Sequence, residues 1–307
     1  MKKALITGAD GFIGTHLITE LVKNNIEVWA IVHPTSPTKE RIKNNPHIHC
    51  IECDIFELQE YISCFPFDID VCYHLAWQGV NALERDDLSY QMQNISLGIK
   101  CIEFAAQINI KKMIFPGSTS EYLFYGKPID KNATPSASNA YGTVKIAFRY
   151  IAEHYTRKLG LEYVYVVLSG IYAADRRDNN VIFYTIDKLL NEEKPSLTKL
   201  EQLWDYIHIS DAVTALRLVG EKGKPYSFYA IGCGDNQPLY EYIYCIRDYI
   251  NPSLPLGIGE IPYSSDILPC SCVDIDDITH DTGFLPQIHF ADGIKEVIDT
   301  MKKEKLQ

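Results

Sequence analysis

The first fourteen residues constrain the fold of this chain more than any other stretch. An apolar run of strand type, Lys3 to Thr7, ends in a turn with glycines at positions 8, 11 and 14, and helical spacing follows over residues 16–22. Gly8 can adopt the φ angles of a tight turn, Gly11 lets a pyrophosphate approach the backbone, and Gly14 lets the helix pack close to the strand. The order strand, glycine turn, helix predicts a phosphate-binding βα unit.

The start of this helix is where phosphates should bind. The first N–H groups of a helix have no partner within it, and the helix dipole is positive at that end. Together they attract anions. We therefore predict a dinucleotide site formed by Gly8, Gly11, Phe12, Ile13 and Gly14.

Composition and charge narrow the class of protein. The chain has 307 residues and a net charge of −11, which argues against a nucleic-acid partner. No stretch approaches the roughly 20 apolar residues of a membrane span, and the first strand leaves no room for a signal peptide. Nine cysteines, an odd number, suggest reduced thiols, and Cys270-x-Cys272 has no second pair with which to bind a metal. We expect a cytoplasmic protein without a metal.

Strands and helices alternate through the first half of the chain. After the first strand come apolar runs of strand type at 26–32, 47–53, 70–76 and 112–115, and a long helical pattern covers 88–108. Such alternation predicts an α/β fold with a doubly wound parallel sheet, in which ligands bind at the carboxyl ends of the strands.

The end of the second strand should decide which dinucleotide binds. An acid there would accept hydrogen bonds from the ribose of NAD and repel the 2′-phosphate of NADP. Here the strand runs into His33, with Thr35, Ser36, Lys39 and Arg41 nearby and no carboxylate at its tip. We favour NADP, with NAD possible; an ordinary polar loop is the alternative reading.

The third and fourth strands also end in candidate cofactor contacts. Asp54 could accept a hydrogen bond from the adenine amino group, although a helix-capping role is equally compatible with its position. Ile55 could pack on the adenine ring. Leu75 and the small Ala76 would leave room for the dinucleotide at the fourth tip, where His74 is expected to be a packed polar residue.

Catalytic side chains are predicted at the fifth tip and on the next helix. Tyr141 and Lys145 are four residues apart and therefore share a helix face. A lysine ammonium favours phenolate and should lower the pKa of Tyr141, so that the phenol can exchange a proton with a carbonyl or alcohol near pH 7. Ser118 could hydrogen-bond the same oxygen.

At these residues the chain resembles the extended short-chain dehydrogenase/reductases that act on nucleotide-sugars. The resemblance runs from Lys3 to about Lys302 and rests on the glycine turn, the Gly-Ser-Thr-Ser-Glu-Tyr segment at 117–122 and the Tyr-x-x-x-Lys pair. Weaker matches are residues 73–76, Asn94, the Trp-Asp-Tyr-Ile-His-Ile-Ser-Asp segment at 204–211 and Gly-Phe-Leu-Pro at 283–286.

The resemblance implies a Rossmann domain over residues 1–169 and a smaller α/β substrate lobe over 170–307, from which some segments return to the sheet. It implies that Ser118, Tyr141 and Lys145 are catalytic, with Thr119 as the alternative if the strand tip is shifted by one residue. Lys145 would also hold the nicotinamide ribose, and Asn94 would belong to a water relay behind it. A homodimer is the family expectation.

Departures from the family pattern narrow the reaction. The dehydratases carry an acidic pair after the catalytic threonine; here Ser120 occupies the first of these positions and only Glu121 remains. The segment looks more like that of the 4-keto-6-deoxy-sugar reductases. The family usually has an asparagine after the sixth strand, which is expected here at residues 163–168; Gly170 occupies that place. Arg176 and Arg177 could pair with the substrate's diphosphate instead; a solvated loop is the alternative.

The sequence thus predicts an NADP(H)-dependent reductase of the C4 ketone of a nucleotide-linked 4-keto-6-deoxy sugar. In this prediction Thr119, Arg176 and Arg177 contact the substrate. The first alternative is a nucleotide-sugar 4-epimerase with tightly bound NAD. A non-catalytic NADP-binding protein is a third possibility from a different class.

Overall fold

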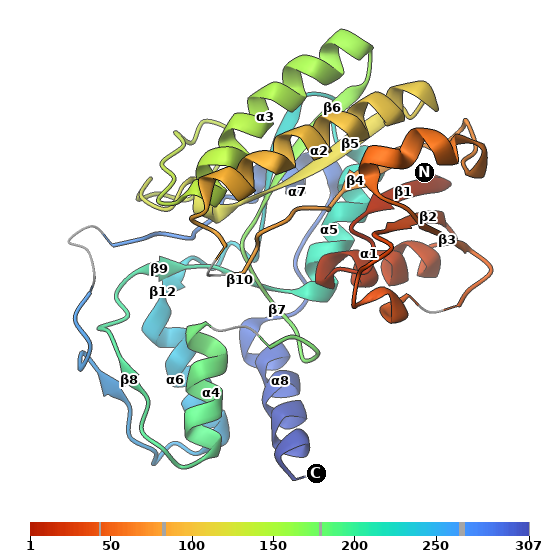
Figure 1. The fold of residues 1–307 in the computed structure, drawn as a ribbon. Helices are drawn as coiled ribbons and strands as arrows, with labels where there is room; N and C mark the ends of the chain where they lie inside the picture. Colours follow the sequence, from red (N-terminus) through yellow and green to blue (C-terminus); the bar gives the residue numbers. More distant parts are fainter. Residues whose placement is uncertain (43, 82–83, 178–179, 264–267, 307) are drawn as a thin grey trace.

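The structure is a computed structural model that describes residues 1–42, 44–81, 84–177, 180–263 and 268–306. Its centre is a parallel sheet of seven strands in the order β11-β6-β5-β4-β1-β2-β3 (Figure 1). The strands are β1 (Lys3–Thr7), β2 (Glu27–Val32), β3 (Ile48–Glu52), β4 (Val71–His74), β5 (Lys112–Ser118), β6 (Glu162–Leu168) and β11 (Ser227–Ile231). This doubly wound order confirms the predicted fold class.

The chain begins in the middle of this sheet. It builds outward from β1 through β2 to β3, and then crosses back to place β4 on the other side of β1. Leu5 of β1 is accordingly in register with Trp29 of β2 and with Cys72 of β4. The strand order reverses between β1 and β4, and a crevice for a ligand forms at such a reversal.

Helices cover both faces of the sheet. On one face lie α2 (Leu88–Gln107) and α3 (Ala140–Leu159), which pack on each other; α1 (Phe12–Lys23) and α5 (Ile209–Lys222) pair on the other (Figure 1). The short η2 (Ile55–Cys64) packs on α2, and α7 (Asp276–Thr282) packs on α5 and β11.

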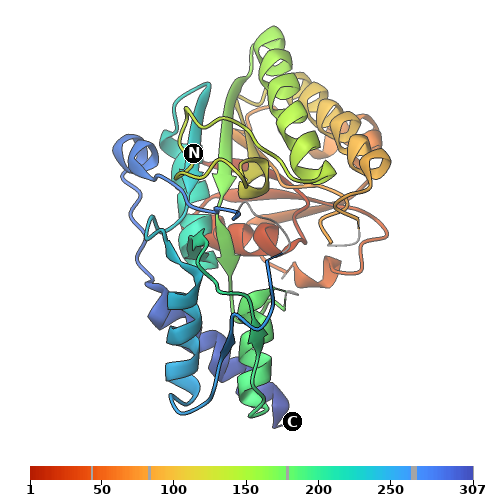
Figure 2. The same cartoon turned by 90° about the vertical axis from the view of Figure 1, so that its left-hand side faces the viewer.

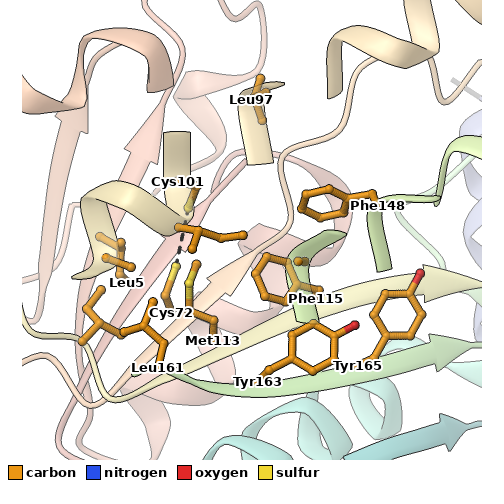
Figure 3. Packing of buried hydrophobic residues seen from close by; sticks show 14 of the residues in the cluster. Leu5, Cys72, Leu97, Cys101, Met113, Phe115, Phe148, Leu161, Tyr163 and Tyr165 are labelled. Atoms are coloured by element: carbon orange, nitrogen blue, oxygen red, sulfur yellow. Dashed lines mark hydrogen bonds between the residues drawn. The ribbon is translucent and has the colours of Figure 1, made fainter. Parts of the chain in front are cut away.

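Each face of the sheet packs against its own cluster of buried apolar side chains, and this explains why the strands are continuous apolar runs. Leu5 points into the cluster under α2 and α3, whereas Ala4 and Ile6 point into the cluster under α1 and α5, and all three are fully buried. A strand buried on both faces needs apolar residues at successive positions. Figure 3 shows the first cluster, in which the thiols of Cys72 and Cys101 lie 3.9 Å apart among apolar side chains.

A second group of helices lies beyond the sheet. In Figures 1 and 2, α4 (Val181–Leu190), α6 (Leu239–Ile250) and α8 (Phe290–Lys305) extend away from one end of it, and they enclose a third apolar cluster. Short strand pairs accompany them: β7 (Gly170–Tyr172) with β10 (Tyr206–His208), β9 (Leu203–Trp204) with β12 (Gln237–Pro238), and β8 (Ser196–Leu197) with β13 (Gly257–Ile258). The boundary at residue 169 stays a prediction.

Candidate active site

The glycine-rich turn is shaped to receive a phosphate. Gly8 has a φ of 65°, and a Cβ on it would lie 2.8 Å from the backbone nitrogen of Ala76 at the tip of β4. A Cβ on Gly14 would lie 2.5 Å from the carbonyl oxygen of Gly8. Gly11 caps α1 in an extended conformation and offers no side chain, so the first N–H groups of α1 are left for a ligand. These features fit the pyrophosphate of a dinucleotide.

The tip of β4 is fixed to this turn. The hydroxyl of Thr7 lies 2.8 Å from Nδ1 of His74, and the backbone N–H of Ala76 donates to the same hydroxyl at 3.3 Å. His74 is buried, which confirms that it is a packed polar residue. Leu75 and Ala76 are half-buried beside the turn, where the sequence expects the dinucleotide to pass.

At the third tip, Asp54 performs the capping role that the sequence left open. Its carboxylate accepts the backbone N–H of Phe56 at 2.9 Å at the start of η2 and also lies 3.5 Å from Nε2 of His33. Ile55 is buried in the cluster under α2. Contacts of Asp54 and Ile55 with an adenine stay predictions.

The predicted catalytic side chains converge at the end of β5. Ser118 ends the strand and begins η3 (Thr119–Glu121), while Tyr141 lies in the first turn of α3, which Asn139 caps. The hydroxyl of Ser118 lies near the phenol of Tyr141 and acts to lower its pKa. Lys145 lies one helical turn further along, buried, with its Nζ 5.4 Å from the centre of the Tyr141 ring.

The ammonium of Lys145 contacts a carbonyl oxygen and an aromatic ring, while its charge depends mainly on burial and on Glu121. It donates a hydrogen bond to the carbonyl oxygen of Pro116 at 2.9 Å and lies 3.7 Å from the centre of the Trp77 ring. Burial lowers its pKa to about 8, although the carboxylate of Glu121 acts in the opposite direction. At neutral pH Lys145 is therefore cationic, and it loses its proton as the pH rises through about 8.

The expected lowering of the Tyr141 pKa is wrong for this structure. Burial raises the pKa of Tyr141 to about 12, and the charge that opposes this rise most is the guanidinium of Arg85, 5.0 Å from the centre of the tyrosine ring. The ammonium of Lys145 instead faces Pro116 and Trp77. The phenol therefore keeps its proton throughout the neutral range.

Sequence reasoning missed Arg85 and Trp77. Both residues come after β4 in the chain. At the end of this strand, candidate contacts were predicted from the sequence only as far as Ala76. Arg85 accepts the backbone N–H of Tyr141 at 2.8 Å through its carbonyl oxygen, and Asp86 accepts that of Ala140 at 3.0 Å. The rule that ligand-binding groups follow strand tips would have found these residues if the whole connection to α2 had been considered.

Asn94 holds this same connection in place. Its Oδ1 accepts the backbone N–H of Gln78 at 2.7 Å, and its Nδ2 donates to the carbonyl oxygens of Gln78 and Gln91. One turn earlier on α2, the side chain of Gln91 accepts the indole N–H of Trp77 at 2.9 Å. Asn94 thus positions the loop that carries Trp77; a role in a water relay stays a prediction.

The fully buried Glu121 supports the strand tip from below. Its Oε1 accepts the backbone N–H of Ser118 at 2.7 Å and the hydroxyl of Tyr165 at 2.9 Å, and burial raises its pKa. A Cβ on Gly117 would lie 2.5 Å from this same oxygen, so only glycine fits there. The carboxyl group is therefore fully buried and shielded from solvent.

Thr119, Arg176 and Arg177 are predicted to contact the substrate, and the structure places them in three different environments. Thr119 is buried, and its hydroxyl accepts a hydrogen bond from Ser271 at 2.8 Å. The guanidinium of Arg176 lies 4.4 Å from the centre of the Phe12 ring, beside the glycine turn. Arg177 instead pairs with Glu304 of α8 at 2.6 Å, so the structure does not bring it to the site.

A doubly wound sheet with a phosphate-binding turn, and a Ser, Tyr and Lys set at its carboxyl edge, defines the class of dinucleotide-dependent oxidoreductases. Residues 4–232 match the model of the NAD dependent epimerase/dehydratase family, and the chain belongs to this family. The family and the class of enzyme expected from the sequence are confirmed.

Relatives and solved structures agree with this assignment. A putative UDP-glucose 4-epimerase from Methanocaldococcus jannaschii is 27% identical over 97% of this chain and 98% of its own length. A CDP-abequose synthase from Salmonella muenchen is 26% identical over 97% of both chains. The structure of UDP-glucose 4-epimerase from Thermotoga maritima, solved with UDP-glucose, superposes with a TM-score of 0.83 at 20% identity and covers 99% of this chain and 100% of its own. None of the helices within the described ranges is long and apolar enough to cross a membrane.

The charge of Lys145 should depend on Glu121. In a Glu121→Gln variant the amide oxygen can still accept from Ser118 and Tyr165, but the anion that raises the pKa of Lys145 is gone. We expect this pKa to fall below about 8, so the alkaline limb of the pH profile of dinucleotide binding moves to lower pH. Glu153→Gln, which removes a half-buried acid from the same helix as Lys145, is the matched control. An alkaline limb that stays in place in Glu121→Gln would contradict the coupling.

Proposed function

We propose that this enzyme reduces the C4 ketone of a nucleotide-linked 4-keto-6-deoxy sugar. The observation that carries the proposal is the convergence of Ser118, Tyr141 and Lys145 at the end of β5, with the phenol of Tyr141 buried and the guanidinium of Arg85 5.0 Å from the centre of its ring. Burial raises the pKa of this phenol to about 12. A phenol that holds its proton at neutral pH is ready to donate it to an alkoxide. The reverse task, removing a proton from a sugar hydroxyl, requires phenolate.

The chemistry divides between cofactor and protein. A reduced nicotinamide dinucleotide, when bound, supplies a hydride for C4. Tyr141 donates its proton to the C4 oxygen, and Ser118 hydrogen-bonds the same oxygen as negative charge develops on it. The charge of Arg85 stabilises the phenolate that remains. The ketone thereby gains one hydride and one proton and becomes an alcohol.

One further observation supports reduction of a keto sugar over dehydration. The carboxyl group of Glu121 is fully buried and engaged by Ser118 and Tyr165, so it is not exposed to act on a sugar. A nucleotide-linked sugar as the substrate is supported by the CDP-abequose synthase, which is similar over nearly the whole chain and carries such a sugar in its name. Arg176, beside the glycine turn, is the residue we propose for the sugar diphosphate.

Replacement of the phenol tests this proposal. Tyr141→Phe should lower kcat for reduction of a nucleotide-linked 4-keto sugar by about a hundredfold or more, because the proton donor is lost. Dinucleotide affinity should stay close to wild type. The change is measured by consumption of the reduced dinucleotide, with Tyr150→Phe on the exposed side of the same helix as the control. Unchanged turnover in Tyr141→Phe would contradict the assignment of Tyr141 as the proton donor.

The second candidate is a nucleotide-sugar 4-epimerase, favoured by the epimerases among the relatives and the solved structures. Such an enzyme oxidises and re-reduces C4 and retains its NAD throughout the cycle. Denaturing the purified protein and identifying the nucleotide it releases separates the two. We expect substoichiometric release; one NAD per chain would favour the epimerase.

We also propose a homodimer through α2 and α3. A mostly apolar cavity of about 380 Å³ lies over these helices, lined by Ile99, Tyr150, Ile151, His154 and Tyr155. Tyr150 is 56% exposed there, an unusual exposure for so large a ring on a helix face.

Light scattering after size exclusion should give twice the chain mass of 34.9 kDa. Tyr150→Glu should shift the protein to monomers, because it places a charge in the apolar contact. Phe67→Glu changes an equally exposed ring outside these helices and should leave the dimer intact. A wild-type monomer would rule the dimer out.

A further inference from the structure

The indole of Trp77 lies against the charged group of the proposed site. The ammonium nitrogen of Lys145 is 3.7 Å from the centre of the Trp77 ring, and it donates a hydrogen bond to the carbonyl oxygen of Pro116 at 2.9 Å. Lys145 is only 6% exposed, so little water can reach this ammonium. A cation over the face of a tryptophan is attracted by the ring quadrupole, and the stabilisation is larger when the cation is desolvated.

A hydrogen bond to a buried amide fixes the orientation of this indole. Its Nε1 donates to Oε1 of Gln91 at 2.9 Å, and Nε2 of Gln91 donates to the carbonyl oxygen of Gly79 at 2.7 Å. Gln91 is fully buried. The rings of Phe148 and Tyr141 pack against the indole, with centroids 5.9 and 6.2 Å from its own. The indole cannot turn away from Lys145 without leaving a buried amide oxygen unpaired, which is costly.

The titratable groups around the ammonium stabilise its charge only in part. Burial lowers the pKa of Lys145 to about 8; the carboxylate of Glu121 on η3 acts against this, and the guanidinium of Arg85, in the connection after β4, acts with it. Tyr141, on the same helix, is a neutral phenol in this range, because burial raises its pKa to about 12. Burial also raises the pKa of Glu121 to about 7, so its negative charge is incomplete near neutral pH. The indole does not titrate, and its attraction for the ammonium persists across this range.

We propose that Trp77 is a positioning residue, which holds the ammonium of Lys145 in place and helps to keep it charged for the dinucleotide-dependent reaction. The proposal rests on the function proposed above, in which Lys145 belongs to the site. It adds an aromatic residue from the connection after β4 to the Ser, Tyr and Lys set. Among the residues that the structure describes, this ammonium donates a hydrogen bond only to Pro116, which leaves its other N–H groups for the hydroxyls of a ligand.

The first test observes Trp77 directly in the protein without ligands. The chain has three tryptophans, and the double variant Trp29→Phe/Trp204→Phe keeps only Trp77. A charge over the face of an indole alters its fluorescence, so the emission of this variant should change in one step with a midpoint at about pH 8 or above. The step should be lost when Lys145→Met, whose side chain does not ionise, is added. Emission that shows no such step, or a step that survives Lys145→Met, would overturn the proposal.

The second test asks whether the contact controls binding. In Trp77→Leu the ammonium loses its aromatic neighbour and its pKa falls, so the alkaline limb of the pH profile of dinucleotide binding should move down by about one pH unit. Trp77→Phe keeps a smaller ring face and should move the limb less; it replaces Trp77→Leu if that variant does not fold. Trp29→Leu removes a buried indole from the cluster under α2 and α3 and should leave the limb in place. An unmoved limb in the Trp77 variants, or an equal shift in Trp29→Leu, would overturn the positioning role.

The outcomes separate this proposal from the function on which it rests. A protein that shows the fluorescence step and the shifted limb but reduces no 4-keto sugar supports the role of Trp77 and overturns the reductase. A protein that reduces the sugar, but whose alkaline limb is unmoved in the Trp77 variants, supports the reductase and overturns the role of Trp77. A protein that binds no dinucleotide overturns both.

Discussion

The active-site edge of this protein depends on one buried carboxyl group. Glu121 receives the backbone N–H of Ser118 and the hydroxyl of Tyr165, and so fixes the end of β5 to the neighbouring strand β6. Because Gly117 has no side chain, the carboxyl group can lie directly beneath the strand. The same group opposes the loss of charge on Lys145. A single core residue therefore holds the serine in position and also helps to keep the lysine charged.

The connection between β4 and α2 forms the opposite wall of the site. Helix α2 holds it from one side through Gln91 and Asn94, and its far end meets α3 through Asp86, which accepts the backbone N–H of Ala140. Tyr141 thus stands on a helix whose first turn is built partly from another segment. The indole of Trp77 and the guanidinium of Arg85 reach the phenol and the ammonium because both ends of this loop are fixed.

The sequence predicts the sheet well because its signals are local. The strand at residues 3–7 and the long helix from residue 88 are defined by apolar runs and periodicity, which depend little on partners. The helix α5 was not predicted, since residues 204–211 were considered only as a family motif. The contact of Arg177 with Glu304 and that of Glu121 with Tyr165 could not be predicted, because they join segments far apart in the chain. The pKa of Tyr141 depends on burial, and the spacing of residues in the sequence does not tell how deeply a side chain is buried.

The position of Asp10 has a consequence for how the glycine turn is held. Strand β2 lies between β1 and β3 and is buried on both faces. Asp10 instead lies in the turn after β1 and accepts hydrogen bonds from the hydroxyls of Ser36 and Thr38 in the connection that follows β2. The turn shaped for a phosphate and this connection are therefore joined by side chains that belong to neither strand.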